Sequence, residues 1–365
     1  MKKPELIKFI ESHNNWEEIL QEEPYNLKIA RDNGFIIFNY GINANFSIPL
    51  VREARGIIFV EKTWKVAAYA FDKFFNITDD FAPEINWKTA KILEKIDGSL
   101  IKVWNYEGEW KISTNRGIDA KKVDLYPMPT EKIKTFYELF KKASEDKLDY
   151  ALLDSDNTYV FELISPHIKQ VVPYQKNDII HIGTRNNVTL EEIDLNIGIE
   201  KPKEYKFNSC EEMIRAVKKL PYNEEGYVVV DDNYNRVKVK SPAYIKAANL
   251  KNNSVITNKR ILNMILNDNL NEFLLYFPEY EKRINEFLEV HNAFFADICA
   301  DLDKVKKLKT LSRKDFARWG KKTTLPCITF AYYSGLFKKE NVVEYTYEHV
   351  LNTTLLKYIE KKMLS

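Results

Sequence analysis

The sequence predicts an α+β protein in which a domain of strands with a few helices precedes an all-helical domain. The length of 365 residues suits two domains. Up to about residue 246, short runs of β-branched and aromatic residues alternate with turn signals. Beyond that point, apolar residues recur at helical spacing, and glycine occurs only at Gly320 and Gly335. We therefore expect a first domain over residues 1–246 and an all-helical second domain over residues 247–365.

Eight segments of the first domain have the composition of strands. They cover residues 51–60, 64–71, 99–106, 109–116, 159–164, 179–184, 226–231 and 236–240. Glu107-Gly108 joins the third segment to the fourth, and this pair predicts a hairpin.

Two helices are expected to interrupt these strands. Near residues 130–146, apolar side chains recur at i, i+3, i+4 and i+7. Near residues 209–219, Ser209 and Glu212 predict a capping box. In the second domain, the same helical spacing begins at Ile261, at Leu270 and at Ile284.

The composition excludes several classes of protein. With 45% hydrophobic and 30% charged residues, the chain is too apolar to be disordered. No stretch approaches 18 apolar residues and the N-terminus lacks the apolar core of a signal peptide, so no membrane contact is expected. Cys210, Cys299 and Cys327 lie too far apart for a metal or disulfide pattern, which favours a reducing cytoplasm. The net charge of +2 excludes a chain that is basic throughout but allows a local basic patch.

The first motif that suggests chemistry is Lys95-Ile96-Asp97-Gly98, just before an expected strand. Alone it is equally typical of a surface turn, because Asp-Gly favours turns. It stands, however, in an ordered series with Glu53-Ala54-Arg55-Gly56, Phe161-Glu162-Leu163-Ile164, Glu224-Glu225-Gly226-Tyr227-Val228 and Val237-Lys238-Val239-Lys240. The last motif alternates at period 2, so Lys238 and Lys240 point to one face of their strand. Two lysines on one face of a strand usually mean only that this face is solvated. The order of the whole series of motifs is what makes the pattern specific.

In this order the motifs resemble those of the covalent nucleotidyltransferase superfamily, which includes ATP-dependent polynucleotide ligases and mRNA capping enzymes. Within it the chain is most similar to the phage-type RNA ligase 1 family, the tRNA-repair ligases. Arg55-Gly56 before an apolar strand, and Lys73-Phe74-Phe75-Asn76, add to this resemblance, as do the length and the helical second domain. The resemblance implies a nucleotidyltransferase domain with ATP-grasp-like antiparallel sheets over residues 1–246.

The resemblance also implies a reaction. Lys95 would attack the α-phosphate of ATP and form lysyl-AMP, with Lys238 and Lys240 completing the catalytic set. A free lysine is protonated at pH 7 and must lose its proton before it is a nucleophile. Nearby cations favour that loss and also neutralise the phosphates as charge develops. Arg55 and Lys73 would add to this positive surround.

Individual ATP-binding roles follow from the same resemblance. They fall on Arg55, Lys73, Asp97, Gly98, Arg116, Phe161, Glu162, Lys238 and Lys240. Asp97 and Gly98 would shape a turn near the ribose, and Glu162 would bond the ribose with Phe161 packed beside it. Arg116 stands where the family tends to carry a lysine, so it keeps the charge but not the compact ammonium.

The implied metal is Mg²⁺, for which Mn²⁺ can substitute, because oxygen ligands and phosphate suit a hard cation. Glu225 would hold it near the phosphates. Tyr244, through water, and Asp268 are further candidates for its surroundings. Asp268 is explained equally well as a helix-terminal aspartate.

The second domain contains a basic segment between residues 304 and 322, which has nine lysines and arginines and one aspartate. The segment is either a solvated helix face or a surface that binds folded RNA. For the second case we expect Arg313, Lys314 and Arg318 to contact RNA. The family resemblance implies a tRNA broken in its anticodon loop, and no obligate protein partner is expected.

The predicted function is therefore ATP-dependent joining of 5′-phosphate and 3′-hydroxyl RNA ends through lysyl-AMP and an adenylylated RNA end. One alternative is another polynucleotide ligase or a capping-type enzyme. Both normally continue into a β-barrel domain, whereas the segment after Lys240 has helical spacing. The other alternative is a non-catalytic RNA-binding relative, against which the complete set of motif residues argues.

Overall fold

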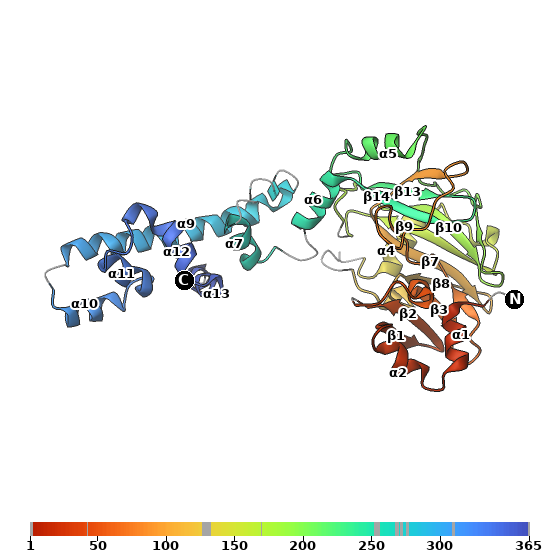
Figure 1. The fold of residues 1–365 in the computed structure, drawn as a ribbon, viewed down its shortest axis with the longest axis horizontal. Helices are drawn as coiled ribbons and strands as arrows, with labels where there is room; N and C mark the ends of the chain where they lie inside the picture. Colours follow the sequence, from red (N-terminus) through yellow and green to blue (C-terminus); the bar gives the residue numbers. More distant parts are fainter. Residues whose placement is uncertain are drawn as a thin grey trace. The chain divides into compact units, whose positions relative to one another are not determined.

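The computed structural model describes residues 3–363, apart from short gaps at 42, 126–132, 169, 252–255, 267–269, 271–272, 275–276 and 309–310. The chain divides into two compact units, Met1–Asn249 and Leu250–Ser365 (Figure 1). The first unit contains three sheets with helices packed on them, and the described part of the second is helical. The predicted α+β fold class is confirmed.

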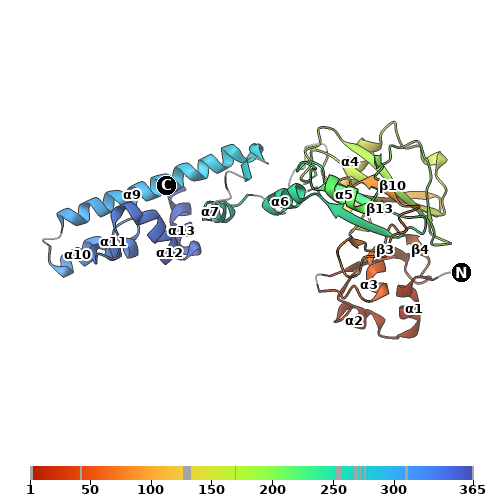
Figure 2. The same ribbon diagram turned by 45° about the horizontal axis from the view of Figure 1, so that its top comes forward.

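The first sheet has four antiparallel strands. Their order is β1 (Leu27–Asp32), β2 (Phe35–Tyr40), β3 (Arg55–Val60) and β4 (Val66–Ala68). Three helices accompany it, α1 (Glu5–Ser12), α2 (Trp16–Gln21) and α3 (Pro49–Glu53) (Figure 2). Helix and sheet share one core, in which Leu6, Phe38 and Phe59 are fully buried.

The strand expected over residues 51–60 is wrong in its first part, because α3 occupies residues 49–53. Pro49 lies in the first turn of α3, where the fixed φ angle of proline favours a helix. Leu50 and Val51 are buried in the same core as Leu6, so tertiary packing also favours the helix. The strand expected over residues 64–71 is likewise shorter, since β4 covers only Val66–Ala68.

The second sheet has five antiparallel strands. Their order is β11 (Glu192–Ile193), β10 (Asp178–Asn186), β9 (Asn157–Ile164), β7 (Ser99–Tyr106) and β8 (Glu109–Thr114). The hairpin predicted at Glu107-Gly108 is confirmed. Both residues have positive φ angles, 51° and 83°, as a two-residue turn between twisted strands requires.

Helix α4 (Phe136–Ser144) packs Leu139 and Phe140 into the core of this second sheet. It begins after Thr135, whose side chain accepts a hydrogen bond from the backbone N–H of Glu138. Ile133, which the helical spacing includes, therefore lies before the helix. Short 3₁₀ turns, η1 (Ala120–Lys122) and η2 (Tyr150–Leu152), flank the same region.

The third sheet carries two of the motifs. Its order is β12 (Glu204–Tyr205), β6 (Lys91–Glu94), β13 (Gly226–Val230), β14 (Arg236–Lys240) and β5 (Phe75–Asn76), antiparallel except for the β14–β5 pair. Helix α5 (Cys210–Val217) buries Met213 against it. Only half of the predicted capping box forms at α5. Ser209 Oγ accepts from Glu212 N at 3.1 Å, but the Glu212 carboxylate accepts from Asn208 N at 2.7 Å.

Helices make up the described part of residues 250–365. After α6 (Pro242–Lys251) come α7 (Asn258–Leu266), η3 (Pro278–Tyr280), α9 (Glu281–Lys307), α10 (Arg313–Gly320), α11 (Pro326–Tyr333), η4 (Lys339–Asn341), α12 (Val342–His349) and α13 (Asn352–Met363). Ile261 and Ile284 are fully buried, as the spacing predicts, whereas the pattern that begins at Leu270 falls partly outside the described residues. Among the helices described, none has the length and apolar character needed to cross a membrane.

Candidate active site

Lys95 lies directly after β6, at the edge of a cavity in the first unit. Its backbone N–H donates to the carbonyl of Gly226 at 2.9 Å, which continues the β6–β13 pairing by one residue. Gly226 has a φ of 136°, and a Cβ there would come within 2.1 Å of the Val239 carbonyl oxygen. Only glycine therefore allows β13 and β14 to approach each other at the point where Lys95 is held.

A buried carboxylate joins two of the predicted lysines. Glu225 Oε2 accepts from Lys95 Nζ at 2.8 Å, and Glu225 Oε1 lies 2.7 Å from Lys240 Nζ. The Glu225 side chain is 4% exposed, against 20% for Lys95 and 30% for Lys240. The β13–β14 register, which pairs Gly226 with Lys240, brings the ends of both strands to this point. The ammonium groups thus lie on opposite oxygens of one carboxylate.

Lys238 adds a further cation on the same face of β14 as Lys240. Burial, and after it the charges of Lys73, Lys240, Lys95 and Arg55 in that order, lowers the pKa of Lys238 to about 8. Five basic side chains therefore surround one region without enough carboxylates to neutralise them. Such a region favours a polyanion such as a triphosphate.

Glu162, on β9, closes the other side of Lys95. Its Oε1 accepts from the backbone N–H of Gly98 at 3.1 Å. A Cβ on Gly98 would lie 2.5 Å from the Leu163 carbonyl oxygen, so the turn needs glycine for this close approach. Burial raises the pKa of Glu162 to about 7, partly offset by the charge of Lys95.

A cavity of about 300 Å³ lies between these residues. Lys95, Glu162, Gly98, Arg55 and Phe74 are among the residues that line it. Two further features point to a ligand. Arg55 Nη1 and Asn115 Oδ1, from residues that line the cavity, are buried and have no hydrogen-bond partner among the described residues. Because a buried polar atom without a partner is destabilising, both atoms are suited to bonding a polar ligand.

Phe161 and Arg116 are not brought into this cavity. Phe161 precedes Glu162 on β9 and points to the opposite face of the sheet, where it is fully buried against Phe140. Arg116 is exposed in the turn after β8, while its neighbour Asn115 lines the cavity. Sequence reasoning missed Asn115; its place directly before Arg116, one of the predicted ATP-binding residues, is the signal that marks it.

Asp97 has an internal role in the structure. Its Oδ2 accepts from the backbone N–H groups of Val171 and Val172, at 2.7 and 3.0 Å. It also hydrogen-bonds the side chain of Tyr244, from α6, and burial raises its pKa. Asp97 thus ties the turn after Lys95 to the loop after β9 and to α6. Tyr244 is 6% exposed and directed at Asp97.

The described residues contain no group of three or more Asp, Glu, His or Cys side chains that would hold a metal ion by themselves. Asp268 lies outside the described residues. Glu225 is a single buried carboxylate beside the cationic region. This donor set fits Mg²⁺, which usually binds one or two carboxylates and takes its other ligands from phosphate and water.

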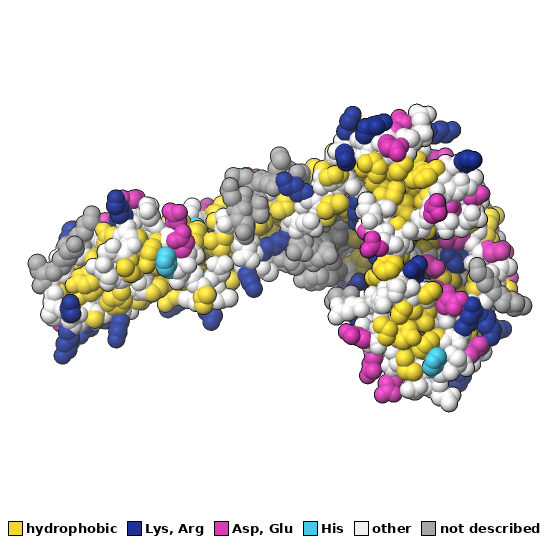
Figure 3. Space-filling model, in the orientation of Figure 1, with side chains coloured by type: hydrophobic (Ala, Val, Ile, Leu, Met, Phe, Trp, Pro, Cys, Tyr) yellow, Lys and Arg dark blue, Asp and Glu magenta, His cyan; other side chains and the backbone are white. Residues whose placement is uncertain are grey.

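In the second unit, Arg313 and Lys314 are exposed on α10, and Arg318 is 67% exposed. Figure 3 shows basic side chains projecting from the end of this unit where α10 lies. Arg318 Nη1 is 3.5 Å from Asp315, a contact too long to neutralise it firmly. Trp319 is half-buried and its ring lies 5.7 Å from that of Phe316, centroid to centroid.

Motifs in this order on antiparallel sheets, with a lysine that lines a cavity, are typical of the covalent nucleotidyltransferases. A family model described as RNA ligase matches residues 53–244, slightly more than half of the chain. The chain therefore belongs to the RNA ligase family.

Individual relatives agree with this family. The chain is 30% identical over 295 residues to a protein of Autographa californica nuclear polyhedrosis virus named as a bifunctional polynucleotide kinase/RNA ligase, covering 73% of this chain and 41% of that protein. It thus spans less than half the length of that relative. It is also 26% identical over 337 residues to an RNA ligase of Rhodothermus phage RM378, covering 74% of this chain and 76% of that protein. Among solved structures, Naegleria gruberi RNA ligase with PPi aligns at 14% identity and a TM-score of 0.33, over 43% of this chain and 51% of that one.

Proposed function

We propose that this chain is an ATP-dependent RNA ligase that joins a 5′-phosphate end to a 3′-hydroxyl end through lysyl-AMP and an adenylylated RNA end. The observation that carries the proposal is the position of Lys95. Lys95 lines a cavity, and its Nζ lies on a buried carboxylate and beside a region of uncompensated positive charge. The membership of the RNA ligase family supports RNA as the polynucleotide.

In the first step, the neutral amine of Lys95 attacks the α-phosphorus of ATP. A P–N bond forms, the bond from the α-phosphorus to the bridging oxygen breaks, and pyrophosphate leaves with the charge that Lys73, Lys238 and Lys240 are placed to neutralise. The amine proton is lost from a nitrogen that already donates to Glu225.

The adenosine would occupy the 300 Å³ cavity. Glu162 lines this cavity and is fixed by its bond to Gly98, so its second carboxylate oxygen is available for a ribose hydroxyl. Arg55 Nη1 and Asn115 Oδ1 supply an unpaired donor and an unpaired acceptor for the same ligand. Asp97 acts as a positioning residue, since its Oδ2 accepts from two backbone N–H groups of the neighbouring loop.

Glu225 is the side chain suited to hold Mg²⁺ or Mn²⁺ once phosphate oxygens supply further ligands. When bound, the ion would supply charge neutralisation for the triphosphate. Glu225 would then share its oxygens between the ion and the two lysines that it contacts now.

In the next two steps, the AMP passes to a 5′-phosphate, and a 3′-hydroxyl then displaces AMP to seal the strand. We propose a tRNA broken in its anticodon loop as the natural substrate. The exposed basic side chains of α10 support a contact with folded RNA in addition to the strand ends.

Incubation of the protein with α-labelled ATP and a divalent ion, followed by denaturing electrophoresis, tests the proposal. Label should remain on the protein, be released by pyrophosphate, and transfer to an oligoribonucleotide with a 5′-phosphate. A protein that binds RNA but never retains label would contradict the proposal and favour a non-catalytic relative.

A further inference from the structure

A second and larger cavity lies beside the proposed ATP cavity in the first unit. Its volume is about 880 Å³, nearly three times that of its neighbour. Phe74 and Arg236 line both cavities and form the wall between them. The proposed reaction with ATP does not need this space, which therefore has room for a second substrate.

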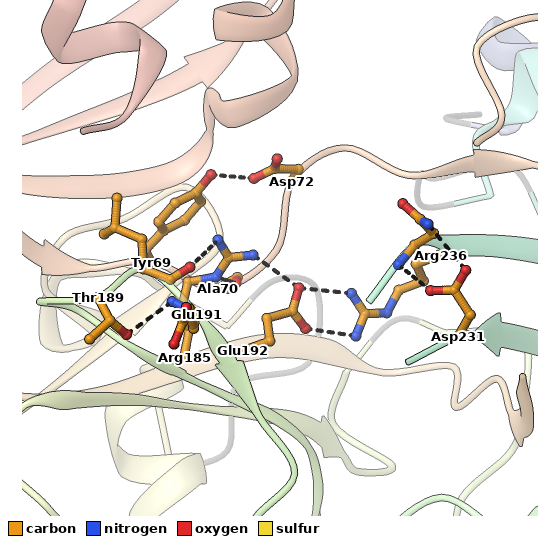
Figure 4. A network of polar contacts seen from close by, with 11 residues as sticks. Tyr69, Ala70, Asp72, Arg185, Thr189, Glu191, Glu192, Asp231 and Arg236 are labelled. Atoms are coloured by element: carbon orange, nitrogen blue, oxygen red, sulfur yellow. Dashed lines mark hydrogen bonds and ion pairs between the residues drawn. The ribbon is translucent and has the colours of Figure 1, made fainter. Parts of the chain in front are cut away.

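The shared wall is held by a buried network of ion pairs, shown in Figure 4. Glu192, on β11, accepts from Arg236 of β14 at 2.8 Å and from Arg185 of β10 at 2.9 Å. All three side chains are at most 12% exposed. The Arg236 guanidinium also lies over the Phe71 ring, 4.3 Å from its centroid. The second and third sheets are therefore joined at a fixed wall, and the cavity is a built feature of the unit.

The larger cavity is also lined by cations that lie on aromatic rings. Arg52 Cζ lies 5.6 Å from the centroid of Phe81, and Lys73 Nζ lies 5.6 Å from that of Phe75. Neither Arg52 nor Lys73 forms an ion pair with another described residue. Phe81, which lines the cavity, is 39% exposed, so one face of its ring is open to a ligand.

The lining matches the parts of a ribonucleotide better than a bare polyphosphate. Two cations without ion pairs suit the backbone phosphates, and the exposed face of Phe81 suits stacking with a base. Two carboxylates that also lack an ion pair among the described residues, Asp80 and Glu191, suit the donors of ribose hydroxyls and base amino groups.

We propose that the larger cavity binds the terminal nucleotides of the 5′-phosphorylated RNA strand, the strand that receives AMP. The proposal rests on the proposed ligase function and extends it to a strand site. Lys73 lines this cavity and also acts on Lys238 through its charge, so it links the cavity to the phosphate-binding region. A strand in the cavity would therefore present its terminal phosphate beside the AMP on Lys95.

The test separates the three steps of the reaction for the Phe81→Ala variant. Lysyl-AMP formation from ATP should proceed at the native rate. The concentration of a 5′-phosphorylated oligoribonucleotide that gives half-maximal AMP transfer from preformed lysyl-AMP enzyme should rise about tenfold, as expected for one lost base stack. Phe81→Trp, which keeps an aromatic face, should stay close to the native value.

Trp87→Ala is the matched control. Trp87 is 41% exposed and lines neither cavity, so its removal should leave both measurements unchanged. Arg52→Gln provides a second variant that does not depend on Phe81. It should weaken the same transfer and lower the salt dependence of oligoribonucleotide binding by about one unit of slope, as one lost phosphate contact does.

Three results would overturn the inference. The first is AMP transfer at the native rate by both Phe81→Ala and Arg52→Gln at all strand concentrations. The second is a loss of lysyl-AMP formation in these variants as large as their loss of AMP transfer. The third is an effect confined to the 3′-hydroxyl strand when preadenylylated RNA is sealed. The last would show that the other strand occupies the cavity. Failure of the native protein to form lysyl-AMP would instead refute the proposed function, so the two failures are distinguishable.

Discussion

The lowered pKa of Lys238 predicts how ATP binding depends on pH. Lys238 is partly buried among four other basic side chains, which together with burial bring its pKa to about 8. The ammonium is then about nine-tenths charged at pH 7 and about one-tenth charged at pH 9. A bound triphosphate favours the charged form, so binding above pH 8 must first supply a proton to Lys238. By linkage, the affinity for ATP should fall about tenfold between pH 7 and pH 9, or about 1.4 kcal/mol.

The assay uses a non-transferable α,β-methylene analogue of ATP, so that covalent chemistry does not disturb the equilibrium. Calorimetric titration at half-unit steps of pH gives the dissociation constant. Lys238→Arg is the control, because a guanidinium remains charged throughout this range. The variant should bind with a nearly constant affinity between pH 7 and pH 9, although its different shape is expected to change the absolute value.

The reasoning is refuted if the native protein and Lys238→Arg lose affinity in parallel as the pH rises. The loss would then come from another group in the site. It is equally refuted if native affinity is constant up to pH 9, since the triphosphate would then not contact Lys238.

The remaining predictions concern catalysis, stability and RNA binding. Lys95→Ala and Lys95→Arg should both retain the fold but form no lysyl-AMP on a denaturing gel, because an arginine stays protonated; label on either variant would exclude Lys95 as the nucleophile. Glu225→Ala and Lys240→Ala should each slow label incorporation by about a hundredfold or more, and native rates in both would show that the motifs are misaligned. Lys102 is fully buried, donates to the Gly56 carbonyl and has a pKa lowered to about 7. Between that value and the ordinary 10.5, the unfolded chain binds one more proton, so native stability should rise with pH by about 1.4 kcal/mol per unit from this group. Denaturant titrations should show this rise missing in Lys102→Met. Charge reversal of the three basic side chains of α10 should reduce sealing of a nicked tRNA but not of a short unstructured oligonucleotide; an equal effect on both would argue against RNA reading by this helix.

Local patterns in the sequence were sufficient to predict several features of the first unit. The turn at Glu107-Gly108 and the span of β14 follow from short-range turn and strand chemistry. The hairpin between β1 and β2 could have been found in the same way. Asn33-Gly34, with φ angles of 47° and 81°, joins these strands and is a strong hairpin signal.

Features that depend on distant parts of the chain could not be predicted in this way. The two-residue strands β5, β11 and β12 exist only through their partners in the sheets. Phe161 is adjacent to Glu162 in sequence, yet the alternation of β9 buries it on the opposite face. Glu192 has no motif of its own, and its role emerges only because three strands bring Arg185 and Arg236 to it. The order of motifs thus indicates which residues meet, but not which of their atoms remain available for a ligand.

The charges around Lys95 explain why the site favours a triphosphate. Arg55, Lys73, Lys95, Lys238 and Lys240 face three nearby carboxylates, those of Glu162, Glu225 and Asp97, and Oδ2 of Asp97 is already directed to backbone N–H groups. Glu225 is shared between two lysines, and burial raises the pKa of Glu162 to about 7, so at neutral pH it is only partly charged. The ligand-free site therefore carries an excess of positive charge, which together with burial lowers the pKa of Lys238. A triphosphate would remove that excess, and its departure as pyrophosphate would restore it beside the 5′-phosphate of the incoming strand. The same cations can in this way serve the formation of lysyl-AMP and the capture of its acceptor in turn.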